Sequence, residues 1–193
     1  ILEKGGNAFD AGVATAFTLQ VVEPHLNGPG GDVPIIVHDT KRGRTEVICG
    51  QGPAPAKATI AHYKSEGLEM VPGTGLLAAC VPGTFESWML LLRDYGTVSL
   101  AESLQPAIDY AQSGFPVVPR ISQAILAVRT LFDSEWHSSR DNWLPDGKVP
   151  RPGELFCNAP LAATYQRILR ETSALAEGDA GRVRRIDAAM QCW

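Results

Sequence analysis

The sequence lacks a long hydrophobic run and a basic tract. No apolar segment reaches the roughly 18 residues that a membrane-spanning helix requires, so no membrane span is expected in this chain. The formal net charge of the 193 residues is −4, and a mildly acidic chain offers no electrostatic attraction for nucleic acid. The one short basic cluster, Arg182, Arg184 and Arg185, is expected to be a solvated helix face rather than a binding patch.

Close pairs of metal-binding or disulfide-forming residues are also missing. The cysteines show no CxxC spacing, which argues against a zinc site and a disulfide framework. We expect four buried free thiols, at Cys49, Cys80, Cys157 and Cys192. Free thiols do not identify the cellular compartment. The histidines form no HxxxH or HxH pair, so neither a metal nor a cofactor is expected. The opening residues 1–6 show no basic-then-apolar segment, so no secretory signal is expected within this sequence.

Signals for nucleophilic catalysis are sparse. The sequence has no GxSxG element, the motif that marks the nucleophile of α/β-hydrolases. Glu102 and Asp109 are expected to be exposed helix carboxylates rather than an acid–base pair. His25 lies beside a glycine-rich loop, and it is the one histidine that we treat as a candidate functional residue.

Sequence signals for helices are frequent along the chain. Residues 8–22 are almost wholly apolar, with Asn7 as a candidate N-cap and Glu23-Pro24 as the stop. Because this segment has almost no polar face, we expect its helix to be buried on most sides. Ser99 and Glu102 have capping-box spacing. Further helices are expected at residues 85–95, 99–112, 121–132, 161–176 and 182–193, with Gly96 and Gly114 as stops and Pro106 as a kink or a helix start.

One β-hairpin is expected between residues 33–38 and 45–49. The continuous run Ile35-Ile36-Val37 is typical of a strand buried on both faces. Residues 51–59 are rich in Gly, Pro and Ala and predict a loop that leads into a short helix. The polar segment 133–158 predicts irregular surface chain.

The glycine-rich block Gly28-Pro29-Gly30-Gly31 has two interpretations. It lacks the strand and helix context of a dinucleotide-binding loop and the Lys-Ser/Thr of a P-loop. It is either a tight turn that requires positive φ, or a loop that brings backbone N–H groups close to a ligand or to a neighbouring chain.

Several short blocks occur in a fixed order along the chain. The first is Gly5-Gly6-Asn7-Ala8-Phe9-Asp10-Ala11, followed by residues 21–25 and 28–31. The later blocks are residues 54–59, 81–84, 95–97, 105–107 and 113–117. Taken together, these blocks resemble the gamma-glutamyltransferase (gamma-glutamyltranspeptidase) family. The matched blocks lie in the part of the family that forms the large subunit.

The resemblance implies an α+β fold, as a helix-rich part of the αββα sandwich of N-terminal-nucleophile hydrolases. In that family a precursor cuts itself into a large and a small subunit. The cut frees a threonine whose hydroxyl attacks a gamma-glutamyl amide, with its own α-amine as base. That threonine opens a Thr-Thr-His-x-Ser-like stretch, and no such stretch occurs here. Residues 1–193 are therefore expected to be an incomplete large-subunit portion without a catalytic residue. Its partners would be the rest of that subunit, the small subunit and an amide substrate.

One departure from the family concerns the substrate. In characterised transpeptidases an arginine shortly before the Ala-Pro-Ala block binds the substrate α-carboxylate, because a guanidinium matches a carboxylate in charge and geometry. The aligned residue here is Gln51, which can form hydrogen bonds but carries no charge. Gln51 is therefore the candidate substrate-binding residue, with an ordinary polar loop residue as the alternative.

Three functional hypotheses follow from the resemblance. The first is part of a gamma-glutamyltransferase-like amidohydrolase or acyltransferase that is made as a zymogen and acts in glutathione metabolism. The second is a cephalosporin-acylase-like amide hydrolase on the same fold. The third is a non-catalytic truncated or pseudoenzyme domain.

Overall fold

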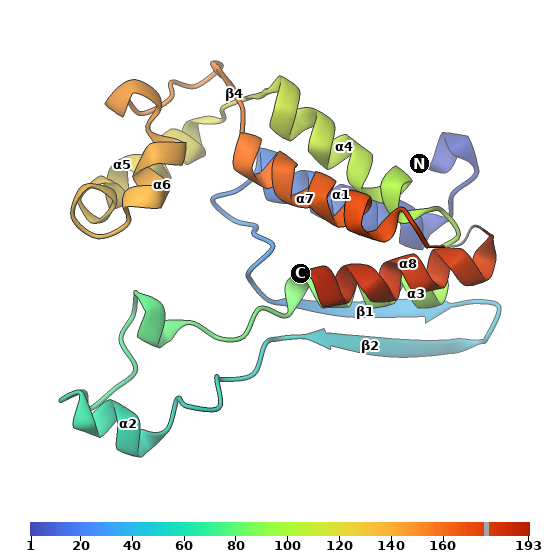
Figure 1. Ribbon diagram of the computed structural model, residues 1–193, viewed down its shortest axis with the longest axis horizontal. Coiled ribbons are helices and arrows are strands. Elements are labelled where there is room, and N and C mark those ends of the chain that lie inside the picture. Colours follow the sequence, from blue (N-terminus) through green and yellow to red (C-terminus); the bar gives the residue numbers. More distant parts are fainter. Residues whose placement is uncertain (176–177) are drawn as a thin grey trace. The chain divides into compact units, whose positions relative to one another are not determined.

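The computed structural model describes residues 1–175 and 178–193. They form two compact units, residues 1–28 with 88–193 and residues 29–87. The first unit is helical, and the second contains a β-hairpin and the short helix α2 (Ile60–Ser65) (Figure 1). Helix α3 (Thr84–Tyr95) runs across the boundary between the two units.

The first unit consists mainly of helices of two to four turns. They are α1 (Ala8–Val22), α4 (Leu100–Ser113), α5 (Pro119–Ser134), α6 (His137–Trp143), α7 (Ala159–Thr172) and α8 (Asp179–Cys192). Two short strands, β3 (Phe115–Pro116) and β4 (Leu155–Phe156), pair in antiparallel fashion. The helices expected from the sequence are confirmed, with ends that shift by a few residues; Ala176, the expected end of α7, lies outside the described residues.

The capping signals place the starts of α1 and α4. The Asn7 side chain accepts a hydrogen bond from the Asp10 backbone N–H at 2.9 Å, and the Asp10 carboxylate accepts one from the Asn7 N–H at 2.8 Å. Ser99 and Glu102 form the same reciprocal box at the start of α4. Such boxes satisfy N–H groups that a helix terminus leaves without partners. Since α4 begins at Leu100 and continues through Pro106, the proline is not the helix start.

Helix α1 is exposed along a single stripe, formed by Ala8, Gly12, Thr15 and Leu19, and is buried or half-buried elsewhere. Val13, Phe17 and Val21 are fully buried, whereas Gly12 and Leu19 are exposed. The expectation of a helix buried on most sides therefore holds except along this one stripe. Helix α4 is the main packing partner of α1.

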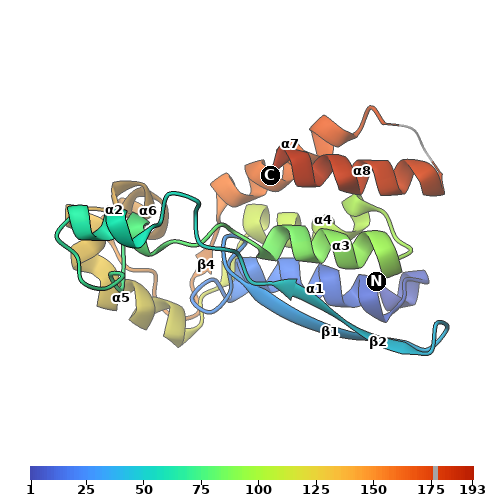
Figure 2. The ribbon, with the colours of Figure 1, turned by 90° about the horizontal axis from the view of Figure 1, so that it is seen from below.

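The core of the first unit lies around α4, which packs against both α1 and α7 (Figure 2). The Phe17 ring meets the Tyr165 ring edge-on at 5.6 Å. The Tyr165 hydroxyl donates a 2.6 Å hydrogen bond to the Gln20 side-chain oxygen. Burial raises the pKa of Tyr165, so the phenol stays neutral. The Tyr165–Gln20 hydrogen bond links α7 to α1 across 145 residues of sequence.

The second unit is built on an antiparallel hairpin of β1 (Val33–Asp39) and β2 (Arg44–Gly50). The hairpin and the short helix α2 after the 51–59 loop confirm the sequence prediction. Burial on both strand faces is wrong. Ile35 and Val37 are buried, but Ile36 is 75% exposed and its cross-strand partner Val47 is 66% exposed. Side chains alternate across a strand, and within the described residues only one face of the hairpin is covered.

The segment 133–158 is more regular than its polar composition predicted. It contains α6, a 3-10 turn at Pro145–Gly147 and strand β4. The Trp143 ring stacks on Phe156 at 4.9 Å, and Trp136 lies 6.3 Å from Phe132. Burial of these rings favours ordered structure in a segment whose other side chains are polar.

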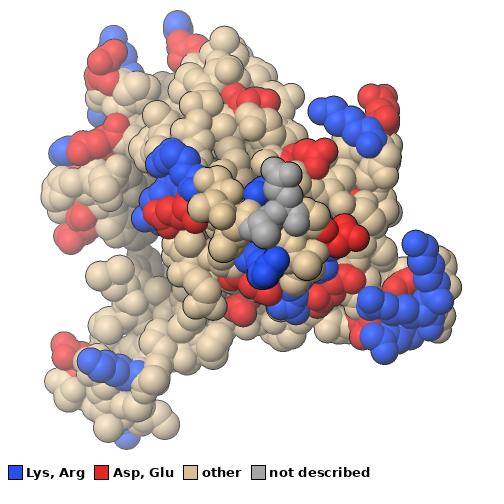
Figure 3. Space-filling view, turned by 45° about the vertical axis from the view of Figure 1, so that its right-hand side comes forward, with Lys and Arg blue, Asp and Glu red and all other residues tan. Residues whose placement is uncertain are grey.

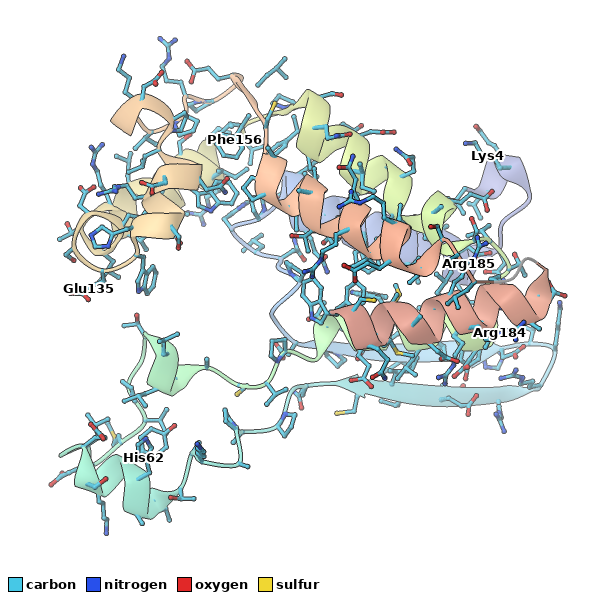
Figure 4. All side chains as sticks on the ribbon, in the orientation of Figure 1. Lys4, His62, Glu135, Phe156, Arg184 and Arg185 are labelled. Carbon is cyan, nitrogen blue, oxygen red and sulfur yellow. The ribbon has the colours of Figure 1, made fainter. Side chains whose placement is uncertain are left out.

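The basic cluster of α8 also differs from the expected solvated face. Arg182 donates to the backbone oxygens of Leu92 and Arg93, the last turn of α3, at 2.9 and 3.1 Å. Arg185 donates to the Leu175 oxygen at 2.7 Å, and only Arg184 is exposed (Figure 4). A guanidinium supplies donors to carbonyls that a helix end leaves unpaired. On the face in Figure 3, most basic side chains lie beside acidic ones.

The cysteines are free thiols but are not buried. Cys49, Cys80 and Cys157 are exposed, and Cys192 is half-buried. The expectation of buried thiols is therefore wrong, because these positions lie on loops, at the uncovered hairpin face and at a helix end.

In the described ranges, no helix combines the length and the apolar composition needed to cross a bilayer. No group of three metal-ligating side chains gathers among these residues.

Candidate substrate-binding site

Three loops of the second unit meet at the beginning of β1, the end of β2 and the beginning of α3. The Gly31 carbonyl accepts hydrogen bonds from the Gly83 and Thr84 backbone N–H groups, both at 3.2 Å. The Val81 N–H donates to the Pro53 carbonyl at 2.9 Å. These bonds join segments that lie about 30 to 50 residues apart in sequence. Each of these segments contains or adjoins one of the blocks that carry the family resemblance.

This junction requires glycine because a larger residue would overlap the neighbouring backbone. A side chain added at Gly52 would overlap the Val81 backbone, and one at Gly50 would overlap the Val33 carbonyl. One at Gly83 would meet the Gly50 carbonyl at 2.5 Å. The backbones can approach this closely only because these residues lack a Cβ.

The same loops surround a hollow of about 540 Å³. Its polar side chains are Asp32, Gln51 and Cys80, all of them exposed. The remaining lining comes from small or apolar residues: Gly30, Gly31, Gly52, Ala79 and Val81. Gln51, the predicted substrate-binding residue, therefore lies in a hollow rather than on a flat surface. Its role as a substrate ligand stays a prediction.

The glycine block reaches this hollow by its second half. Gly30 and Gly31 line it, and the Gly31 carbonyl holds the loop before α3. None of Gly28, Gly30 and Gly31 has a left-handed backbone. A turn is present at Pro29 and Gly30, but the expected need for positive φ is wrong. The approach of its N–H groups to a ligand or to another chain stays a prediction.

His25 belongs to a different cavity, of about 190 Å³, in the first unit. It lines this cavity together with apolar side chains of α5 and α6, and its Nδ1 lies 3.6 Å from a Glu23 carboxylate oxygen. Nδ1 is buried and makes no hydrogen bond within the described residues. His25 is not among the residues that line the hollow with Gln51. His62 lies on α2 (Figure 4) and does not line that hollow either.

Asp10 is a buried carboxylate that the sequence analysis overlooked as an individual residue. It accepts hydrogen bonds from the Thr97 N–H at 2.8 Å, the Thr97 hydroxyl at 2.7 Å and the Val98 N–H at 3.2 Å, besides that of Asn7. Burial alone would raise the pKa of Asp10, but these hydrogen bonds outweigh it and leave the pKa below its usual value. Asp10 therefore joins the first block of the resemblance to the Tyr95-Gly96-Thr97 block as a structural link.

The hollow is suited to binding rather than to covalent chemistry by itself. Its lining among the described residues offers one carboxylate, one amide and one thiol, but no histidine or lysine that could act as a base. Sequence reasoning found Gln51 and missed Asp32 and Cys80. Asp32 directly follows the glycine block, which is a usable signal, whereas Cys80 reaches the hollow only through the tertiary approach of residues 79–81.

Comparison with known proteins supports the sequence resemblance. The family model described as Gamma-glutamyltranspeptidase matches residues 1–179. The chain is 38% identical over 182 residues to the glutathione hydrolase-like YwrD proenzyme of Bacillus subtilis, covering 93% of this chain and 34% of that protein. It is 37% identical over 199 residues to the acylase ACY 1 proenzyme of Pseudomonas sp. (strain SE83), covering 94% of this chain and 34% of that protein. The chain thus spans about a third of the length of these curated relatives.

Solved structures give the same result for the fold. The structure of LmbA2991T421A superposes with a TM-score of 0.94 and 54% identity, over 100% of this chain and 32% of that chain. The gamma-glutamyltranspeptidase of Helicobacter pylori superposes with a TM-score of 0.80 and 32% identity, over 88% of this chain and 49% of that chain. These likenesses confirm the α+β fold class as part of an N-terminal-nucleophile hydrolase.

Proposed function

Because the chain belongs to the gamma-glutamyltranspeptidase family, we propose that it supplies a substrate-binding part of an amidohydrolase or acyltransferase. The substrate is a gamma-glutamyl or related amide. The nucleophile is an N-terminal threonine in a segment outside these 193 residues, and residues 1–193 belong to the large-subunit portion of a self-processing precursor. The observation that carries the proposal is the meeting of three family-like segments at the hollow that contains Gln51.

The reaction proceeds through an ester on that threonine. Its hydroxyl oxygen attacks the amide carbonyl carbon, the carbon–nitrogen bond breaks, and the hydroxyl proton passes through the threonine α-amine to the leaving amine. Water or an acceptor amine then attacks the ester, which releases the acyl group and returns a proton to the threonine oxygen. The role of the present chain is to hold the acyl part of the substrate while these bonds change.

The proposal is tested with the protein that carries this chain together with the rest of its reading frame. We expect self-cleavage of the precursor and hydrolysis of a gamma-glutamyl or glutaryl para-nitroanilide. Loss of hydrolysis in a variant whose newly exposed threonine is replaced by alanine assigns the nucleophile. A precursor that neither cleaves itself nor hydrolyses any anilide would instead support a non-catalytic domain.

Gln51 provides a test of the substrate-binding role. Gln51→Arg places a guanidinium in the hollow, where it can pair with the α-carboxylate of a gamma-glutamyl anilide. We expect kcat/KM for that substrate to rise on the order of tenfold, the gain typical of a charged hydrogen bond. Unchanged kcat/KM, with processing intact, would show that Gln51 does not face the substrate carboxylate.

A second candidate is favoured by the uncharged residue at position 51 and by the likeness to an acylase proenzyme. A cephalosporin-acylase-like hydrolase would act on acyl groups that lack the α-amino acid end of glutamate. Wild-type preference for the glutaryl over the gamma-glutamyl anilide would support this candidate.

A further inference from the structure

The hollow around Gln51 carries a single formal charge, and that charge is negative. Its lining residues among those described include the Asp32 carboxylate but no lysine, arginine or histidine. Asp32 is exposed and makes no hydrogen bond or ion pair within the described structure. Its charge is therefore not neutralised by a neighbour, and it is available to a ligand in the hollow.

Some of the backbone donors at this junction are already engaged. The Gly83 and Thr84 N–H groups donate to the Gly31 carbonyl, and the Val81 N–H donates to the Pro53 carbonyl. Glycine-rich loops bind anions when their N–H groups point together at the ligand. The Gly83, Thr84 and Val81 N–H groups instead hold the loops together, so these three donors are not available to a ligand in the hollow.

From these observations we propose that the hollow selects an amide substrate whose end near Gln51 carries an ammonium group, and that Asp32 determines this specificity. This inference rests on the proposed function. A carboxylate in the same position would face Asp32 without a cation, and like charges at short range repel. The Gln51 side-chain oxygen supplies a second acceptor for the same ammonium.

Cys80 offers a direct measure of occupancy. It lines the same hollow and its thiol is exposed, so a ligand in the hollow should slow its alkylation by iodoacetamide. Cys49 and Cys157 are also exposed but are not part of the lining. Their alkylation, followed by peptide mass spectrometry in the same sample, is the internal control.

The kinetic test uses the processed full-length protein and three para-nitroanilides, of δ-aminovaleric, hexanoic and glutaric acid. These acyl chains are of similar length and end in an ammonium, a methyl and a carboxylate group. We expect kcat/KM to fall in that order. Asp32→Asn should lower the ratio of the aminovaleryl to the glutaryl value on the order of tenfold, the size expected when one exposed charge is removed. Glu69→Gln, the same change at an exposed residue outside the lining, should leave the ratio unchanged.

The occupancy test does not depend on turnover. n-Butylammonium should protect Cys80 in the wild type, n-butyrate at equal concentration should not, and Asp32→Asn should remove the protection. Preference for the glutaryl anilide, or a ratio unaffected by Asp32→Asn, would overturn the inference and leave the proposed function standing. If no anilide is hydrolysed, the proposed function fails. Independently of turnover, equal protection of Cys80 by both ions, or protection by neither, overturns the charge selectivity of the hollow.

Discussion

The two units of this chain are stabilised in different ways. The helical unit contains most of the fully buried large side chains, including Phe17, Leu104 and Tyr165. Residues 29–87 bury few side chains and expose large apolar ones such as Ile36, Met70 and Leu76. Close glycine contacts and a few backbone hydrogen bonds hold their loops together. Packing stabilises the first unit, whereas the second uses backbone proximity to form a hollow.

The largest expected effect comes from the core of the helical unit. Phe17→Ala removes a fully buried ring that contacts Tyr165, and a cavity of this kind costs about 3–5 kcal/mol. Ile36→Ala in the second unit removes a side chain that is 75% exposed and should cost less than about 0.5 kcal/mol. Urea denaturation measures both. Equal losses would mean that the hairpin face is as well packed as the helical core.

Asp10 is expected to have the next largest effect. Asp10→Asn removes the charge that four hydrogen bonds from Asn7, Thr97 and Val98 stabilise, with an expected loss of about 2–3 kcal/mol. Because the folded pKa of Asp10 lies below its usual value, its contribution is present above the unfolded pKa and is lost as the pH falls through the folded pKa.

The pH profile provides the control for Asp10. Wild-type stability should decline as the pH is lowered below about 4, the usual carboxyl range, and the decline should be shallower in Asp10→Asn. Glu69→Gln should keep the wild-type slope, because Glu69 is exposed and makes no described interaction. Parallel slopes for wild type and Asp10→Asn would contradict the role given to the hydrogen bonds.

A smaller effect is expected from the glycine junction of the second unit. The Cβ of Gly52→Ala would overlap the Val81 backbone, and overpacking of this kind costs about 1–3 kcal/mol. A Cβ at Gly73, which does not line the hollow, meets nothing within 4 Å, so Gly73→Ala serves as the matched control. Thermal denaturation and the rate of Cys80 alkylation should both change for Gly52→Ala and stay near wild type for Gly73→Ala. The opposite pattern would show that the loops are not held by close approach.

Local signals in the sequence predicted most helix and strand positions. Asn7, the Ser99–Glu102 pair, Gly96 and Gly114 act within a few residues of the helix ends that they define. Contacts between distant segments could not be predicted in this way. The Asp10–Thr97 link spans 87 residues, the Arg182 bond to Leu92 spans 90, and helix α6 depends on aromatic contacts such as Trp143 with Phe156.

The candidate site was predictable only in part for the same reason. Gln51 was proposed because the family resemblance aligns it with the carboxylate-binding arginine of characterised transpeptidases. The hollow around it forms when residues 30–32, 51–52 and 79–81 meet, and no spacing rule predicts that meeting. Conversely, Ile36 was expected to be buried, because an apolar run alone does not tell whether a second layer covers it in this chain.

The central claim is that this chain binds substrate and does not contain the nucleophile. The most direct measurement is hydrolysis of gamma-glutamyl and glutaryl para-nitroanilides by the purified 193-residue chain, beside the processed full-length protein at equal concentration. The account predicts release of nitroaniline by the full-length protein and none above the buffer rate by the chain alone. Hydrolysis that rises in proportion to the concentration of the isolated chain would contradict it.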